Sequence, residues 1–334
     1  MRVLHVGPKN FPPSHGGVEK VAHDLMVGMK GVESHVLTEW NNDSPQARVG
    51  VLEPGILRAV RQIRRYCREQ AIDVVHLHKE SFTPHALLLS LMGIRCVMTF
   101  HGCGWRLARW PLYLRIGVFL MDCLACLWGP RVVLVGERDW QLFRRLFFFR
   151  RIYFVRNGVS SERCAAGTSK SFMVYLGRLS PEKNILGLVR AAESCGVELD
   201  LYGPFDKHDP GYRISVLNLL DRCEHVRWRG VVPFDEVRQT LAQYRVFVNP
   251  SFSEGLPVSV LEAAGEGLHL VLSDIPPHRL LGFPSCCYID PFRLDLANIP
   301  WSTLDGEQNY EHVRTAFSLD GMIQAYEEIY KGMV

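Results

Sequence analysis

The first half of the chain alternates short apolar runs with stretches of helical periodicity. Helical patterns are clearest at residues 18–29 and 56–69, where apolar side chains recur every three or four positions. Strand-like apolar runs lie at residues 3–6, 34–38, 74–77, 96–100, 132–135 and 152–155. Apolar strands separated by helices are typical of a parallel sheet with both faces covered.

The same alternation restarts after a polar stretch near residue 157. Strand-like runs lie at 172–176, 198–202, 226–229, 246–249 and 268–272, with helical patterns at 185–194, 212–223, 234–244 and 258–265. We therefore predict an α/β fold with two doubly wound, Rossmann-like domains at 1–156 and 171–318, a linker at 157–170 and a final helix in 319–334. Because ligands of such domains bind beyond the carboxyl ends of the strands, functional residues should follow strands.

Composition places the chain among ordinary folded proteins. Apolar residues make up 47% and charged residues 22% of its 334 residues, which excludes a disordered or fibrous chain. The ten cysteines lack the spacing of a disulfide framework and the first apolar run is too short for a signal peptide, so we expect reduced thiols and a cytoplasmic location.

Charge is unevenly distributed between the two halves. Residues 1–156 contain 22 Lys and Arg against 12 Asp and Glu, whereas residues 157–334 contain 16 against 23. The basic half suggests a partner surface for an anionic substrate, an anionic membrane or nucleic acid. A general preference for arginine, with 30 Arg and 8 Lys in the chain, is the alternative.

Paired glycines precede the first helix. Gly16 and Gly17 would let a ligand approach the backbone, and the free N–H groups of a helix start attract anions. The pair lacks the three spaced glycines of the dinucleotide fingerprint. A simple turn into a helix explains it equally well.

Two further loops follow predicted strands of the second half. Arg178 and Lys183 lie five residues apart on a loop that enters a helix, so they could clamp a diphosphate or could be solvated. Glu254 lies in a Gly/Pro loop, and Glu262 lies about one turn into the next helix, after Pro257. A carboxylate there can accept hydrogen bonds from both hydroxyls of a ribose, or can pair with the helix dipole.

These motifs together resemble the retaining GT-B glycosyltransferases, specifically the large family-four group of the glycosyl transferases group 1 type. The matching segments occur in family order: GGVE at 16–19, TFHG at 99–102, VRNGVS at 155–160, GRLSPEK at 177–183 and SEGLPVSVLEA at 253–263. The two glutamates fit the E-x7-E signature, and SDIPPH at 273–278 and the ending at 317–330 fit as well. The resemblance implies an acceptor-side first domain, a nucleotide-sugar-binding second domain and a final helix that crosses back to the first.

The resemblance also implies roles for the charged residues of the second domain. Glu262 would bind the donor ribose, and Arg178 and Lys183 would hold the donor diphosphate and neutralise the leaving nucleotide. Glu254 would contact the transferred sugar. Preorganised cations stabilise the negative charge that develops as the glycosyl–phosphate bond breaks.

Backbone groups and one histidine complete the implied site. Gly255 and Leu256 would contact the sugar through their backbone. His101 would lie near that sugar from the other domain, where Gly16 and Gly17 would face the diphosphate. No Asp-x-Asp motif is present to hold a metal, so we expect neither metal nor cofactor, and a UDP- or GDP-type sugar donor as substrate.

The expected activity is transfer of a hexose or N-acetylhexosamine to a saccharide or lipid-linked acceptor, in bacterial surface polysaccharide or lipopolysaccharide assembly. The alternatives are a non-catalytic sugar-nucleotide-binding protein and a GT-B sugar-nucleotide epimerase. An acceptor-independent change in the donor would identify the epimerase. Nucleic acid is not an expected partner, because the basic residues lack a recognisable reader motif.

Two weaker signals remain. His76 and His78 share a strand face, but the sequence offers no evident third metal ligand, so we interpret them as a strand end. The segment 105–151 mixes Arg, Trp and Phe around an apolar stretch that Arg115 and Asp122 interrupt. It is a poor membrane span, but its composition suits peripheral contact with the inner face of the cell membrane; a buried helix pair with an arginine rim is the alternative.

Overall fold

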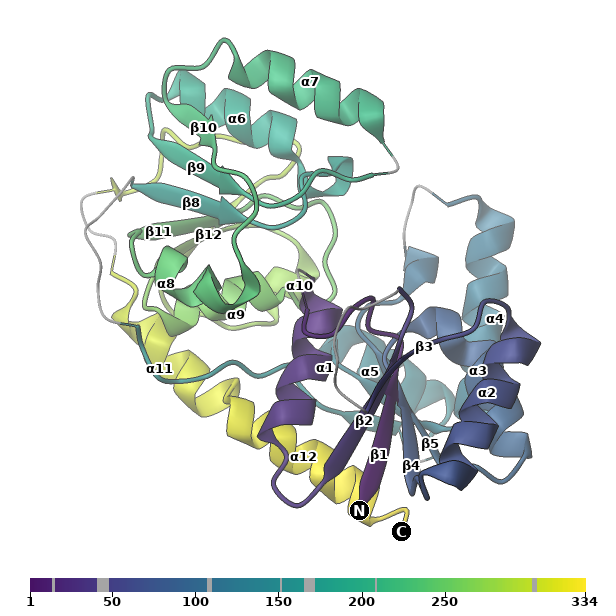
Figure 1. The fold of residues 1–334 in the computed structure, drawn as a ribbon. Coiled ribbons are helices and arrows are strands. Elements are labelled where there is room, and N and C mark those ends of the chain that lie inside the picture. Colours follow the sequence, from purple (N-terminus) through teal and green to yellow (C-terminus); the bar gives the residue numbers. More distant parts are fainter. Residues whose placement is uncertain are drawn as a thin grey trace. The chain divides into compact units, whose positions relative to one another are not determined.

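The structure is a computed structural model that describes residues 1–13, 16–40, 48–106, 110–150, 152–164, 172–207, 209–301 and 305–334. The chain forms two compact units. Unit 1 contains Met1–Asn157 together with Leu319–Val334, and unit 2 contains Gly158–Ser318 (Figure 1). Residues 165–170 of the expected linker lie outside the described residues.

Unit 1 is built on a seven-stranded parallel sheet with the order β3-β2-β1-β4-β5-β6-β7. Its strands are β1 (Arg2–Val6), β2 (Glu33–Thr38), β3 (Val49–Val51), β4 (Val74–Leu77), β5 (Cys96–Phe100), β6 (Arg131–Leu134) and β7 (Ile152–Phe154). The central strands β4 and β5 are buried along their whole length, as their continuous apolar sequence predicts.

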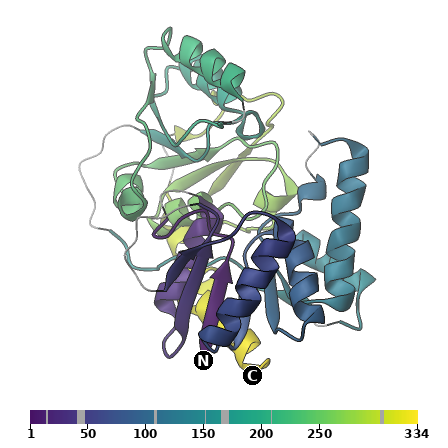
Figure 2. The ribbon, with the colours of Figure 1, turned by 45° about the vertical axis from the view of Figure 1, so that its right-hand side comes forward.

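Helices cover both faces of this sheet (Figures 1 and 2). The elements are α1 (Gly17–Gly28), α2 (Ile56–Glu69), η1 (Glu80–Phe82), α3 (Thr83–Leu91), η2 (Gly104–Arg106), α4 (Leu112–Trp128), α5 (Glu137–Leu146) and α12 (Leu319–Lys331). Helix α12 packs beside α1, while α3 packs between α2 and α4. The last helix of the chain is therefore part of unit 1.

Unit 2 repeats the plan with a six-stranded parallel sheet in the order β10-β9-β8-β11-β12-β13. Its strands are β8 (Met173–Leu176), β9 (Leu199–Tyr202), β10 (Val226–Trp228), β11 (Val246–Asn249), β12 (His269–Ser273) and β13 (Cys286–Ile289). Its helices are η3 (Pro181–Lys183), α6 (Ile185–Ser194), α7 (Pro210–Leu220), η4 (Phe234–Glu236), α8 (Val237–Leu241), α9 (Val258–Gly265), α10 (Pro276–Arg279) and α11 (Glu307–Ala316).

Each sheet has its own hydrophobic core, which confirms the predicted α/β class with two doubly wound domains. The sequence pattern missed β3 and β13, which are short strands at sheet edges and only partly buried. It also missed α11, where Asn309 and Val313 are the only buried positions of the helix. None of the described helices is both long and apolar enough to span a membrane.

Candidate active site

The candidate site in unit 2 is formed by two loops at the carboxyl ends of neighbouring strands. Strands β8 and β11 pair directly, so η3, which follows β8, lies near the loop after β11. The two loops are tied by a hydrogen bond of 2.9 Å from the Phe252 N–H to the Glu182 carbonyl. This places the predicted Arg178–Lys183 and Glu254–Leu256 segments at the same sheet edge.

Lys183 and Glu254 form the centre of the site. The Lys183 ammonium donates to Glu254 Oε1 at 2.6 Å, with 21% of the lysine side chain and 8% of the glutamate side chain exposed. The same oxygen accepts from Asn249 Nδ2 at 3.1 Å and lies 2.8 Å from Ser251 Oγ. A carboxylate with several donors on one oxygen is strongly positioned.

The environment keeps Glu254 ionised. Burial alone raises the pKa of this carboxyl, but the positive charge of Lys183, with His278 and the hydrogen bonds of Lys183 and Ser251, holds the pKa below its ordinary value. Burial lowers the pKa of His278 more than the nearby Glu254 raises it, so we expect a neutral imidazole at pH 7. Its Nδ1 lies 2.9 Å from the Ser273 carbonyl oxygen.

Arg178 is placed differently from Lys183. Its side chain is 51% exposed and lies 3.9 Å from Asp206 Oδ2, while its carbonyl accepts a hydrogen bond from the Tyr175 hydroxyl at 3.0 Å. The loop it occupies is packed closely: a Cβ on Gly203, whose φ is +135°, would lie 1.9 Å from the Gly177 carbonyl oxygen. Only glycine fits at position 203. Arg178 therefore follows a closely packed strand end, while its side chain remains half exposed.

The second glutamate lies deeper. Helix α9 begins after Pro257, and Glu262 lies in its second turn with its side chain buried. Gly255 and Leu256 are half-buried in the loop before the helix. The structure thus brings Lys183 and Glu254 into contact and places Glu262 on the helix that the same loop enters.

In unit 1, Gly16 and Gly17 begin helix α1 as expected. Gly16 precedes the helix with a φ of +110°, a conformation that favours glycine. A Cβ on Gly16 would lie 2.3 Å from Glu19 Oε2, so the Glu19 carboxylate covers this glycine. Glu19 is itself buried and lies 3.7 Å from Lys79 Nζ. A buried carboxylate therefore lies beside this helix start, with the Lys79 ammonium as its neighbour.

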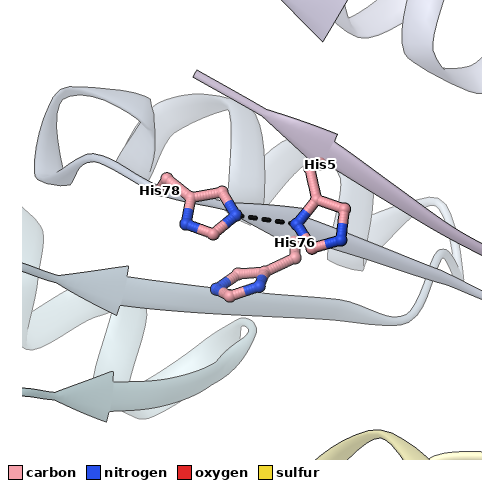
Figure 3. Close-up of side chains that lie close together, drawn as sticks. All are labelled: His5, His76 and His78. Carbon is pink, nitrogen blue, oxygen red and sulfur yellow. Dashed lines mark hydrogen bonds between the residues drawn. The ribbon is translucent and has the colours of Figure 1, made fainter. Parts of the chain in front are cut away.

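His101 follows β5 and belongs to a group of four histidines. His78 stacks towards it, with ring centroids 6.2 Å apart, and beyond His78 lie His5 and His76 (Figure 3). Burial lowers the pKa of His101 to about 4, with a contribution from the charge of Lys79. His101 is therefore expected to be neutral at pH 7, and its Nε2 has no hydrogen-bond partner among the described residues.

The structure supplies the third histidine that the sequence did not reveal. His5 on β1 is in register with His76 on β4, and ring nitrogens of His5, His76 and His78 lie within 4.8 Å of one another. All three are fully buried. The interpretation of His76 and His78 as a strand end agrees with β4, which ends at Leu77. The third histidine was not evident from the sequence, because it depends on the sheet order that places β1 beside β4.

Hydrogen bonding nevertheless favours a neutral imidazole cluster over a metal centre. His76 Nδ1 lies 2.5 Å from the Tyr330 hydroxyl and its Nε2 lies 2.8 Å from Thr99 Oγ1. His5 Nδ1 and His78 Nε2 are 2.9 Å apart, so one donates to the other. In this neutral pair the accepting ring already carries its proton on its outer nitrogen, so a metal on the two facing nitrogens would move only the donor's proton outward. Both His5 Nε2 and His78 Nδ1, which are buried and unpartnered among the residues described, would then be N–H groups without an acceptor.

Sequence reasoning missed Asn249, Ser251 and His278 as supports of Glu254. Their signal was available, because Asn249-Pro250-Ser251 ends a strand and His278 belongs to the SDIPPH segment. Asn249 and Ser251 contact the Glu254 carboxylate from five and three residues before it, whereas His278 acts on it through its charge. Only the influence of His278 depends on sheet order, because β12, which precedes it, pairs with β11.

Two doubly wound parallel sheets in tandem are typical of the GT-B fold, and the similarity to solved GT-B structures shows that fold here. A sucrose-phosphate synthase from Thermosynechococcus elongatus superposes with a TM-score of 0.82 at 16% identity, covering 99% of this chain and 98% of that one. Anabaena HepE in complex with UDP-glucose superposes with a TM-score of 0.81 at 16% identity, covering 99% and 100%.

Family models identify the group more closely. Residues 15–163 match Glycosyltransferase Family 4, and residues 170–282 match Glycosyl transferases group 1. The chain therefore belongs to the family of GT-B glycosyltransferases whose two domains these models describe.

Two curated relatives carry informative names. A GDP-mannose:cellobiosyl-diphosphopolyprenol alpha-mannosyltransferase from Xanthomonas oryzae pv. oryzae is 26% identical over 325 residues, which cover 83% of this chain and 80% of the relative. A UDP-Gal:alpha-D-GlcNAc-diphosphoundecaprenol alpha-1,3-galactosyltransferase from Escherichia coli is 25% identical over 290 residues, which cover 75% and 71%.

Proposed function

We propose that this glycosyltransferase moves a hexose or N-acetylhexosamine from a UDP- or GDP-type sugar donor to a saccharide or lipid-linked acceptor, with retention of anomeric configuration. The observation that supports this most is the Lys183–Glu254 pair, which is largely buried and lies at the carboxyl ends of β8 and β11. A cation held at this position by a carboxylate can receive a donor diphosphate without the rearrangement of a long flexible side chain.

The proposed chemistry uses charge and position. Lys183 and Arg178 stabilise the negative charge that develops on the leaving nucleoside diphosphate as the bond to the sugar breaks. Glu254, with the backbone of Gly255 and Leu256, orients the sugar, and Glu262 accepts hydrogen bonds from the ribose hydroxyls. The two cations take the part that a bound metal plays elsewhere, and we therefore propose that transfer needs no metal.

The acceptor side is proposed from the relatives and from unit 1. Both curated relatives are named for sugar acceptors linked to a polyprenyl diphosphate. Within the segment 105–151, of which residues 107–109 and 151 lie outside the described part, Phe148 and Phe149 are 82% and 59% exposed. Exposed aromatic side chains beside Arg144 and Arg150 suit an anionic bilayer surface. We infer assembly of bacterial surface polysaccharide or lipopolysaccharide at the cytoplasmic face of the membrane.

Calorimetric titration with UDP, GDP, ADP and CMP tests the donor site. We expect one nucleotide to bind and Glu262→Ala to weaken that binding. Equal weak binding of all four, unaffected by the substitution, would contradict the assignment.

Transfer of a labelled sugar from the matching donor to a polyprenyl-diphosphate saccharide then tests the reaction, with EDTA present to test metal independence. The anomeric configuration of the product, read by NMR, tests retention. A donor altered without acceptor would show an epimerase, and binding without any turnover would show a non-catalytic protein.

A further inference from the structure

Two carboxylates and a thiol of unit 1 converge beyond the carboxyl ends of β4 and β5. Glu80 begins η1 after β4, Cys103 lies in the loop after β5, and Asp122 lies on α4. Strands β4 and β5 pair directly, and α4 packs against η2, which follows Cys103. One carboxylate oxygen or sulfur from each side chain lies within 4.8 Å of those of the other two. We call Glu80, Cys103 and Asp122 the acid–thiol cluster.

The polar atoms of the acid–thiol cluster are buried and lack donors. Asp122 is 0% exposed and Cys103 is 7% exposed. Both Asp122 oxygens and Glu80 Oε1 are buried without a hydrogen-bond partner among the described residues. Burying a carboxylate costs free energy unless it is paired or coordinates a metal, so three such oxygens in one place favour a positively charged ligand.

The other oxygen of Glu80 is held by the neighbouring loop. The Gly104 N–H donates to Glu80 Oε2 at 2.7 Å. A Cβ on Gly104 would lie 2.9 Å from the same oxygen, so a larger residue would displace the carboxylate. The Thr83 hydroxyl donates to the Glu80 carbonyl at 2.8 Å and fixes the backbone. Hydrogen bonds of this kind orient the ligands of metal sites, and they leave Glu80 Oε1 for an ion.

The charge around the cluster is negative. Asp139 adds a third carboxylate within electrostatic reach of Glu80 and Asp122. The counter-charge of Asp139 is Arg106, whose guanidinium lies 2.5 Å from Asp139 Oδ1. Neither Glu80 nor Asp122 forms an ion pair with another residue in the described ranges. A proton shared by these two carboxyls would serve two of the three unpartnered oxygens, whereas a divalent cation compensates both charges.

We infer that the acid–thiol cluster binds a divalent transition-metal ion, with Zn²⁺ as the best match. A thiolate beside two carboxylates suits Zn²⁺ better than Mg²⁺ or Ca²⁺, which take oxygen ligands. Cys103 loses its proton to solvent when the ion binds. Three protein ligands leave a fourth tetrahedral position for water. Glu80 is partly exposed, so the ion can enter from solvent on its side of the cluster.

The ion would join three parts of unit 1, namely the loops after β4 and β5 and the helix α4. The inference does not rest on the proposed function, because the cluster belongs to unit 1 and the proposed donor residues Lys183 and Glu254 belong to unit 2. A metal bound to the cluster therefore leaves the proposal of metal-independent transfer intact.

The test is metal analysis of the full chain, without an affinity tag, after dialysis against a chelator and titration with Zn²⁺ or Co²⁺. A thiolate bound to Co²⁺ gives a sulfur-to-metal charge-transfer band in the near ultraviolet. The ligand variants are Cys103→Ser, Asp122→Asn and Glu80→Gln. The matched controls are Cys223→Ser, which changes a partly exposed cysteine of unit 2, and His5→Phe, which removes one imidazole of the histidine cluster.

Melting curves without metal check that the variants fold. Asp122→Asn keeps the size of the side chain, removes a buried charge and supplies an amide donor beside Glu80. Its metal-free form should therefore melt no lower than the metal-free wild type, and loss of metal binding in this variant reports the site rather than unfolding.

We expect one equivalent of Zn²⁺ per wild-type chain and a higher melting temperature with the ion bound. Each ligand variant should bind Zn²⁺ at least about 100-fold more weakly. Cys103→Ser should also lose the charge-transfer band, while both controls keep the wild-type affinity and band. Wild-type metal binding by folded Asp122→Asn and Cys103→Ser would overturn the inference. So would loss of binding in His5→Phe alone, or a wild type that binds neither ion.

Nucleotide titration separates this inference from the proposed function. Metal-free and zinc-loaded wild type should bind the nucleoside diphosphate equally, because the proposed donor residues belong to unit 2. Zinc binding by the cluster in a chain that binds no nucleotide would count against the proposed function alone. Nucleotide binding by a chain that binds no zinc would count against the metal site alone.

Discussion

Replacing Lys183 by alanine tests the centre of the site most directly. In the wild type Glu254 Oε1 has three neighbours, namely the Lys183 ammonium at 2.6 Å, Asn249 Nδ2 at 3.1 Å and Ser251 Oγ at 2.8 Å. Lys183→Ala removes the charged donor and leaves two neutral ones. The carboxylate is then buried without a counter-charge from the lysine, although water can enter where the partly exposed side chain lay.

The expected effect on turnover is large and the effect on stability is moderate. Loss of one group that stabilises a developing anion lowers kcat by roughly 10²–10³. Breaking a fully buried ion pair costs about 3–5 kcal/mol, but the remaining hydrogen bonds and the 21% exposure of Lys183 place this case at about 1–3 kcal/mol. Lys30→Ala, which removes an exposed lysine outside the site, is the matched control.

The pH dependence of stability gives a second readout. The wild-type pKa of Glu254 lies below its ordinary value near 4.5, so its ionised form stabilises the fold above that pH and loses this contribution on acidification. Without Lys183, burial raises the pKa instead. The stability difference between wild type and variant should therefore be largest at neutral pH. It should begin to shrink as the pH falls through the raised pKa of the variant, above about 4.5, and should go on shrinking until the pH lies below the lowered pKa of the wild type.

Steady-state transfer kinetics and urea unfolding at several pH values make these measurements. A wild-type kcat in Lys183→Ala would remove the lysine from the reaction. A pH-independent stability difference would refute the proposed charge coupling between Lys183 and Glu254.

The remaining predictions concern donor affinity and the imidazole cluster. Glu262→Ala should weaken binding of the nucleoside diphosphate about tenfold or more, because charge-assisted hydrogen bonds contribute about 1.5–3 kcal/mol; unchanged calorimetric affinity would count against the ribose role. Tyr330→Phe should leave His76 Nδ1 unpartnered in the core and cost about 1–3 kcal/mol in urea unfolding at pH 7; an unaltered unfolding midpoint would contradict this. Burial lowers the pKa of His5 to about 3, so its neutral form stabilises the fold fully above pH 6.5 and this contribution is lost as the pH falls from 6.5 towards 3. His5→Phe should therefore flatten the stability profile over that range by about 1.4 kcal/mol per pH unit, and a profile as steep as that of the wild type would argue against a buried neutral His5.

The repeating α/β plan and the loops that carry chemistry could be predicted from local sequence alone. Strand and helix periodicity depend on neighbouring residues, so buried strands such as β4 and β5 could be predicted from their own apolar runs. Edge strand β13 and polar helix α11 could not, because a partly buried element has no continuous apolar pattern to reveal it. The loops that carry the motifs could be located because each of them directly follows a predicted strand.

Contacts between side chains that are distant in the sequence depend on the arrangement of the strands and helices. Lys183 and Glu254 are 71 residues apart and touch because β8 pairs with β11, an order of strands that no local pattern contains. His5 joins His78 because β1 lies beside β4, and Tyr330 reaches His76 because the last helix packs on the first sheet. The same physical cause applies to these three contacts. The periodicity of a sequence indicates which face of one helix or strand is buried, whereas a contact depends on how several buried elements pack in a shared core.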